Sequence, residues 1–311
     1  MKKYDVITVG LQCIDLVSSV VPRGILDREL TIVDSIVMML GGDALNQAVV
    51  LSALGANVGL MGLAGTDRLG DILMAQLSQY PITVLNRRAD VPTTISQVLI
   101  DENHERHFVY QPGTNNAFSY SHIDEDAIRS AKYVSIGGCF ALPALDGDGM
   151  IRLLDLASQA GAKTVLDFRD SVGDADRDLV RALFARADYI VPSQQEVKCL
   201  AGEADTPEGM LENLRALGAG NCIIKLGEKG CLVSADGFEG VVPTYPCKCI
   251  DTTGAGDNFV GAFLYAKTQD WDIIKCAQFA NAAGSIAVEH IGANSAIHSV
   301  EQVLNRMQGI S

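Results

Sequence analysis

The chain has 311 residues, 48% of them hydrophobic, which is enough to bury a large core in one α/β domain or in two smaller ones. Its 24 basic and 38 acidic residues give a net charge of −14 at pH 7, which argues against nucleic acid or an anionic membrane surface as a partner. No run of 18 apolar residues that could cross a membrane is present, and eight scattered cysteines favour reduced thiols in a cytoplasmic protein.

The first predicted element is a buried parallel strand. Residues 6–10 form a short apolar run, rich in β-branched side chains, that ends in Gly10. Asp15 follows near the carboxyl end of this strand, the edge at which open α/β sheets bind their ligands. Taken alone, Asp15 would be interpreted as a surface turn residue. The segment has no Gly-x-Gly-x-x-Gly sequence, which argues against a dinucleotide site of the Rossmann type.

Two segments alternate polar and apolar residues without a helical period. The first covers residues 16–38, and the second covers residues 94–110 around a charged turn. We expect them to form a small sheet outside the main one, inserted into a single domain at about residues 12–38 and 92–112.

A helix is predicted between these two segments. Gly41 and Gly42 precede it, and Gly55 ends it as the residue after the C-cap. Its apolar residues fall on one side of a helix with 3.6 residues per turn, namely Leu45, Ala48, Val49, Leu51 and Leu54. A short strand over residues 58–62 follows.

From residue 124 onward the pattern alternates between helices and strands. Strands are expected at 133–138, 163–169, 189–191 and 222–227, with helices near 147–160, 175–186 and 207–217. This alternation predicts a mostly parallel sheet with helices on both faces, a three-layer α/β domain. One core with the small sheet inserted explains the chain better than two domains.

Several polar side chains are placed where they could meet a ligand. Asp167 and Arg169 lie at the carboxyl end of a predicted strand, where charges cost less than in a core. Tyr110 and Arg106 could reach a substrate from the small sheet, although a solvent-exposed edge is the favoured position for Arg106.

A glycine-rich turn over residues 250–256 opens into a helix. Gly254 and Gly256 let the backbone approach a ligand closely, and a helix start of this kind presents unpaired N–H groups to an anion such as a phosphate. Asp257 would repel that anion unless it accepts the proton of a hydroxyl that attacks the phosphorus. The alternative is that Asp257 only caps the helix.

Two motifs in this chain resemble the signatures of the PfkB carbohydrate kinases, the ribokinase-like family. The segment from Asp251 to Asp257, with Phe259 two residues later, matches the second signature, Asp-Thr-Thr-Gly-Ala-Gly-Asp-x-Phe, without interruption. The segment from Gly41 to Gly55 resembles the first signature, which has two glycines, an Asn four residues later and a helix that ends in Leu-Gly.

The resemblance implies roles for individual residues of this chain. Asp257 would be the catalytic base, and an anion hole would be formed by Gly254, Ala255 and Gly256. The substrate would be held by Asp15, Gly41, Gly42 and Asn46, with Tyr110 and Arg169 as further candidates. The nucleotide would lie against Lys225, Gly227, Gly230 and Asn281.

Metal binding is also implied by the resemblance. Glu196 would act near Mg²⁺ through water, although Ser193 replaces the Asn of the family motif three residues earlier. The ordinary alternative for Glu196 is a carboxylate in the first turn of a helix, which is favourable in its own right. A monovalent cation such as K⁺ would lie beside Asp251 and the loop at Gly292.

The function expected from these motifs is ATP-dependent phosphorylation of a primary hydroxyl of a sugar, as in ribokinases and fructokinases. The small sheet would be a lid over the substrate and the interface of a homodimer. Two alternatives stay open, a nucleoside kinase of the same fold and a non-catalytic regulator that binds a sugar or a nucleotide. A base could stack on Tyr110, Phe118 or Phe140.

Overall fold

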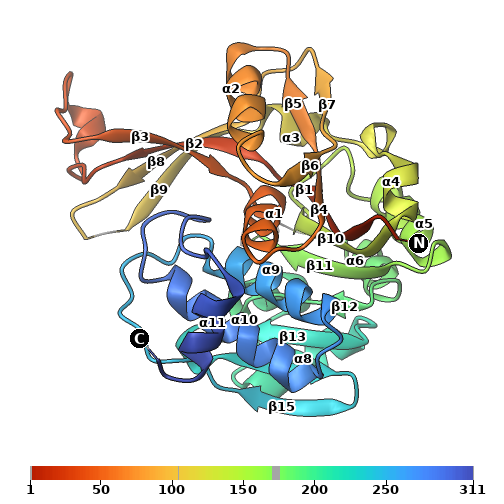
Figure 1. Ribbon diagram of the computed structural model, residues 1–311. Coiled ribbons are helices and arrows are strands. Elements are labelled where there is room, and N and C mark those ends of the chain that lie inside the picture. Colours follow the sequence, from red (N-terminus) through yellow and green to blue (C-terminus); the bar gives the residue numbers. More distant parts are fainter. Residues whose placement is uncertain (1, 104, 170–175, 311) are drawn as a thin grey trace.

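A nine-stranded sheet forms the centre of the molecule (Figure 1). The computed structural model describes residues 2–103, 105–169 and 176–310. In their order across the sheet, the strands are β15 (Phe238–Val242), β14 (Cys231–Ala235), β13 (Asn221–Lys225), β12 (Tyr189–Ile190), β11 (Lys163–Phe168), β10 (Ala131–Cys139), β1 (Tyr4–Gly10), β4 (Val58–Met61) and β6 (Ile82–Val84). Neighbours from β13 to β6 pair in parallel, which confirms the predicted fold class. The antiparallel hairpin of β14 and β15 was not predicted from the sequence.

Helices cover both faces of this sheet, as predicted, and the core forms two apolar clusters (Figure 1). One cluster contains side chains of α1 (Asp43–Ala53), α2 (Arg68–Leu77), α9 (Ala255–Thr268), α10 (Ile273–Ala287) and α11 (Val300–Met307). The other contains side chains of α4 (Glu125–Arg129), α5 (Asp148–Gln159), α6 (Arg177–Phe184), α7 (Gln194–Ala201) and α8 (Pro207–Ala216). The helix predicted near 175–186 is α6, and residue 175 lies outside the described residues.

Strand β1 shows why both faces of the sheet are apolar. Val6 packs in the first cluster, whereas Ile7 and Val9 pack in the second. Successive side chains of a strand point to opposite faces, so a strand between two layers of helices needs apolar residues at almost every position.

A four-stranded sheet extends from one end of the large sheet (Figure 1). It contains β3 (Ile36–Gly41), β2 (Cys13–Ser18), β8 (Ile95–Ile100) and β9 (Arg106–Gln111), in that order. Strands β2 and β3 are antiparallel, as are β8 and β9, whereas β2 and β8 pair in parallel. At its far end Arg23 forms ion pairs with Asp101 at 2.8 Å and Glu105 at 2.9 Å. A two-stranded sheet, β5 (Leu63–Gly65) and β7 (Arg87–Ala89), and the short helix α3 (Gly113–Ala117) complete the fold.

The register of the four-stranded sheet aligns four side chains in one row. Asp15 is opposite Met39 on β3 and Ser96 on β8, and Ser96 is opposite Tyr110 on β9. Residues opposite one another in a sheet lie on the same face. The sheet therefore presents Asp15, Ser96 and Tyr110 side by side toward the cavity that they line.

Helix α9 begins without a side-chain cap, unlike several other helices of the chain. Asp67 caps α2, Thr206 caps α8 and Asp272 caps α10 through side-chain oxygens. Helix α9 instead follows Gly254 and has no side-chain cap, and it begins at Ala255. Asp257 therefore lies within its first turn, whereas the sequence predicts that the helix follows Asp257.

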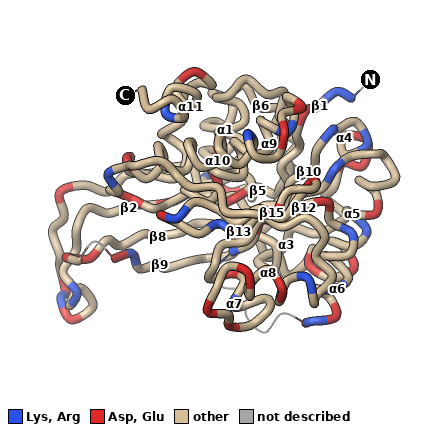
Figure 2. The backbone as a smooth tube through the Cα atoms, turned by 90° about the horizontal axis from the view of Figure 1, so that it is seen from below, with Lys and Arg blue, Asp and Glu red and all other residues tan. Residues whose placement is uncertain are grey.

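Charged residues of both signs are interspersed along the chain around the core (Figure 2). Within the described ranges, no helix combines the length and the apolar composition that a membrane span requires.

Candidate active site

Two cavities lie on opposite sides of the glycine-rich turn before α9. The first cavity has a volume of about 710 Å³ and lies under the small sheet, at the start of α1. The second has a volume of about 630 Å³ and lies between the start of α7, α10 and the turn after β13. Cys249 and Thr252 line both cavities, Asp257 lines the first, and Ala255 and Gly256 line the second. The turn is therefore the wall between the two cavities.

The backbone of this turn presents N–H groups that can bind an anion. Gly254 has a φ of 69°, and a Cβ there would overlap the carbonyl group of Ala293, so only glycine fits without strain. The Ala255 amide donates to the carbonyl of Thr252 at 3.2 Å. The amides of Gly254, Gly256 and Asp257 have no acceptor in the described part of the chain. These donors lie at the positive end of the α9 dipole.

Asp257 is held by a hydrogen bond from the other signature segment. The Nδ2 of Asn46 donates to Oδ2 of Asp257 at 2.8 Å, and the Oδ1 of Asn46 accepts from Nδ2 of Asn294 at 2.7 Å. Burial raises the pKa of Asp257 well above its ordinary value, and the nearby carboxylates of Asp43 and Asp167 raise it further. A buried carboxylate with a raised pKa has the properties of a general base.

Lys225 approaches the turn from the side of the second cavity. A Cβ on Gly256 would lie 3.2 Å from the Nζ of Lys225, so the ammonium group lies against the turn. Lys225 forms an ion pair of 2.7 Å with Asp167, whose other oxygen accepts from Nε2 of Gln47 at 2.8 Å. Burial opposes the charge of Lys225, but Asp167 and Glu196 outweigh it and raise the pKa of Lys225. A fixed cation therefore lies beside the open amides.

The small sheet contributes Asp15 to the first cavity. The thiol of Cys13 donates to Oδ1 of Asp15 at 3.2 Å, and a Cβ on Gly41 would overlap the same carboxylate. Burial raises the pKa of Asp15, whereas the Cys13 hydrogen bond and the charge of Arg169 lower it. Gly41 therefore provides space for the Asp15 side chain, and Gly42 lines the cavity itself.

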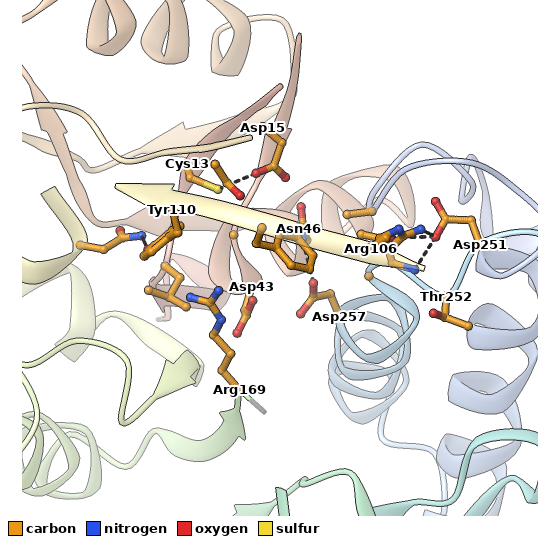
Figure 3. A pocket seen from close by; sticks show the side chains of 18 of the residues that line it. Cys13, Asp15, Asp43, Asn46, Arg106, Tyr110, Arg169, Asp251, Thr252 and Asp257 are labelled. Atoms are coloured by element: carbon orange, nitrogen blue, oxygen red, sulfur yellow. Dashed lines mark hydrogen bonds and ion pairs between the residues drawn. The ribbon is translucent and has the colours of Figure 1, made fainter. Parts of the chain in front are cut away.

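Tyr110 and Arg169 form another side of the first cavity (Figure 3). The guanidinium group of Arg169 lies 4.8 Å from the centre of the Tyr110 ring, a cation–π contact. The Tyr110 hydroxyl accepts from Nδ2 of Asn115 at 3.0 Å, which fixes the ring.

Arg106 reaches from β9 to the loop before α9. It forms an ion pair with Asp251, and its side chain is only 20% exposed, so the predicted solvent-exposed position is wrong. Asp251 also accepts from the amides of Thr253 at 2.7 Å and Gly292 at 2.9 Å. A buried carboxylate is stable only when it is paired and hydrogen-bonded. The ion pair with Asp251 therefore explains why the Arg106 side chain is partly buried.

The residues expected near a nucleotide line the second cavity. Glu196 and Ser193 exchange hydrogen bonds at the start of α7, with the Ser193 amide donating to Oε2 of Glu196 at 2.6 Å. The Nδ2 of Asn281 donates to the carbonyl of Val242 at 2.9 Å, which ties α10 to β15. Ser193 thus caps a helix at the position where the family motif has Asn, and Gly227 and Gly230 lie in the turn that lines the same cavity.

Asp43, Gln47 and Asn294 were missed by the sequence analysis. A signal was available for two of them. Asp43 lies three residues before the predicted Asn46 and four before Gln47 in a mostly apolar helix, which places these polar residues on one side of α1. Asp167 was noted only as a charge at a strand end. Asn294 lies in a loop and had no signal.

Comparisons with known proteins find relatives over nearly the whole chain. Residues 3–299 match the model of the pfkB family of carbohydrate kinases. The chain is 26% identical over 286 residues to a probable fructokinase-4 of Arabidopsis thaliana, covering 86% of this chain and 87% of the relative. Ribokinase from Thermotoga maritima superposes with a TM-score of 0.84 at 24% identity, covering 98% and 99% of the two chains. Adenosine kinase from Sinorhizobium meliloti superposes with a TM-score of 0.84 at 21% identity, covering 99% of each chain. The fold is therefore ribokinase-like, as expected.

The buried pair of Lys225 and Asp167 predicts a stability effect. Replacing Lys225 by Met leaves the 2% exposed Asp167 without its cation, so the free energy of unfolding should fall by about 3–5 kcal/mol. The control is Lys163→Met, because Lys163 is 61% exposed in its pair with Asp188 and should cost about 1 kcal/mol or less. Urea denaturation followed by circular dichroism measures both. Equal losses would contradict the assignment of a buried, stabilised pair.

Proposed function

Because the chain belongs to the pfkB family of carbohydrate kinases, we propose that it transfers the γ-phosphoryl group of ATP to a primary hydroxyl of a sugar, with Asp257 as the general base. The observation that carries this proposal is the position of the turn before α9. Asp257 lies on its side facing the first cavity, and Gly256 lies on its side facing the second. A hydroxyl in one cavity and a phosphate in the other would meet at this wall.

Each group at the wall has a role in this reaction. Asp257 accepts the proton of the attacking hydroxyl, and Asn46 orients its carboxylate. The open amides of the turn and the ammonium group of Lys225 stabilise the charge spread over the phosphoryl oxygens. The small sheet covers the first cavity and excludes water, which limits hydrolysis of ATP.

The nucleotide would occupy the second cavity, against Gly227, Gly230 and Asn281. Mg²⁺ bound with ATP supplies positive charge to the phosphates. The carboxylate of Glu196 lines this cavity, and carboxylate oxygen is a ligand that suits Mg²⁺ directly or through water. We therefore propose that Glu196 acts near Mg²⁺.

The alternatives receive less support. Of the three aromatic residues considered for stacking on a nucleoside base, only Tyr110 lines the first cavity, because Phe118 is buried in the core and Phe140 packs on Phe168. A regulator without activity would have no need of a buried Asp257 that is aligned by Asn46. The cytoplasmic location stays a prediction.

The base assignment predicts the effect of Asp257→Asn. The amide cannot accept the hydroxyl proton, so turnover should fall by roughly 10²–10⁴. ADP release with a panel of sugars and nucleosides measures this loss, and calorimetry checks that the variant still binds ATP. A folded variant that retained nearly full turnover would show that Asp257 is not the base.

We also propose that a monovalent cation such as K⁺ binds beside Asp251, where Arg106 affects its binding. The guanidinium group already neutralises Asp251, so a cation would have to compete with it. We expect Arg106→Gln to be activated by K⁺ more strongly than the wild type, when initial rates are compared in potassium and tetramethylammonium buffers. If neither protein responds to K⁺, Asp251 does not bind a cation.

We also propose a homodimer formed through the small sheet. Large apolar side chains are exposed on its connecting loop, namely Leu26 (94%), Leu30 (75%) and Ile32 (87%). Such clusters of exposed apolar residues mark interaction surfaces. Light scattering should give twice the monomer mass of 33.1 kDa, and Ile32→Asp should shift the protein toward the monomer. A wild type that is monomeric at all concentrations would contradict this proposal.

A further inference from the structure

The first cavity contains more carboxylates than cations. Its charged lining residues are Asp15, Asp43, Glu105, Asp251 and Asp257 against Arg106 and Arg169. Arg106 is paired with Asp251, and Glu105 with Arg23 on the small sheet. What faces a ligand is therefore Arg169 surrounded by three carboxylates.

Asp43 is the carboxylate in this group that the family motif does not explain. It is the first residue of α1. Within the described residues its carboxylate is hydrogen-bonded only to its own backbone amide and forms no ion pair. Figure 3 shows it between Arg169 and Asp257, and all three line the cavity. Burial raises the pKa of Asp43 to about 7, the charge of Asp167 adds to this, and Arg169 and Lys225 oppose it.

The position of Asp43 at a helix start does not account for it. A carboxylate in the first turn stabilises a helix when solvent covers it. Asp148 is such a residue, because it is the first residue of α5, follows Gly147 and is exposed. Asp43 follows Gly42 in the same way but lies in a cavity beside two other carboxylates, where its charge is costly. A ligand that donates hydrogen bonds would offset this cost.

The surroundings of Arg169 disfavour an anionic substrate. Its guanidinium group lies over the Tyr110 ring. Its positive charge lowers the pKa of both Asp15 and Asp43. An anionic group placed there would have to displace these interactions and approach two carboxylates.

We propose that Asp43 is a specificity-determining residue, which accepts a hydrogen bond from a second hydroxyl of the substrate. Together with Asp15 it makes the cavity select uncharged or ammonium-bearing polyhydroxylated sugars and exclude sugar acids and phosphorylated sugars. The inference rests on the proposed kinase function and names the substrate class of that site. A carboxylate that accepts from a hydroxyl forms a charge-assisted hydrogen bond, whereas it repels a second anion.

The test compares Asp43→Asn with the matched control Asp148→Asn. ADP release is measured with ribose, fructose and glucosamine, and with gluconate and fructose 6-phosphate. The wild type should favour its best uncharged or ammonium-bearing sugar over either anionic sugar by roughly a hundredfold or more in kcat/KM. In Asp43→Asn the kcat/KM for that sugar should fall by roughly 10–100-fold, and the preference over anionic sugars should fall at least about tenfold. The control should match the wild type in both respects.

The outcomes separate this inference from the kinase function. A wild type that works best on gluconate or fructose 6-phosphate would overturn the inference and leave the kinase function intact. So would an Asp43→Asn variant, folded by its melting temperature, that loses activity equally on all sugars. If no compound releases ADP, the kinase function itself fails. Calorimetric binding of the same sugars to wild type and Asp43→Asn then decides the role of Asp43, and equal binding to both proteins overturns it.

Discussion

One hydrogen bond joins the two halves of the site, the bond from Asn46 on α1 to Asp257 on α9, which are 211 residues apart in the chain. It forms because the two helices pack closely. A Cβ on Gly261 would lie only 2.9 Å from Cγ1 of Val50, so a larger residue there would push the helices apart. Asn294 holds the other end of the Asn46 amide and fixes which of its atoms faces Asp257. The packing of α1 on α9 thus orients the carboxylate that the proposed reaction requires.

The same packing creates a cluster of buried charges that has to be balanced. Burial raises the pKa of both Asp43 and Asp257, and the nearby carboxylates, Asp167 among them, raise it further. Lys225 supplies a positive charge through its pair with Asp167, and Gln47 satisfies the second oxygen of that carboxylate. Removing charge from water is costly unless partners are present. In the proposed function, this cluster would serve the binding of a phosphate on one side of the turn and of hydroxyl groups on the other more than the stability of the fold.

Much of the fold could be predicted because apolar runs and alternating helices are local properties of the sequence. The continuous apolar run of β1 predicts a strand covered on both faces, which its alternate side chains confirm. The ion pair of Arg106 with Asp251 could not be predicted, because it joins segments 145 positions apart through the placement of the small sheet. Asp43 lies next to a recognised motif, but only the structure shows that it lines a cavity beside other carboxylates. The hairpin of β14 and β15 was missed although the sequence carries its signal, the two-residue turn Asp236-Gly237, in which both residues have positive φ.

The contact of Arg106 with Asp251 links the small sheet, which borders the first cavity, to the main body of the protein. Any outward swing of the small sheet has to break this ion pair, which is partly shielded from water. The loop that holds Asp251 continues into Thr252, which borders both cavities. In the proposed reaction, a movement of the small sheet would therefore shift the backbone next to the second cavity, and entry of the sugar would be coupled to binding of the nucleotide.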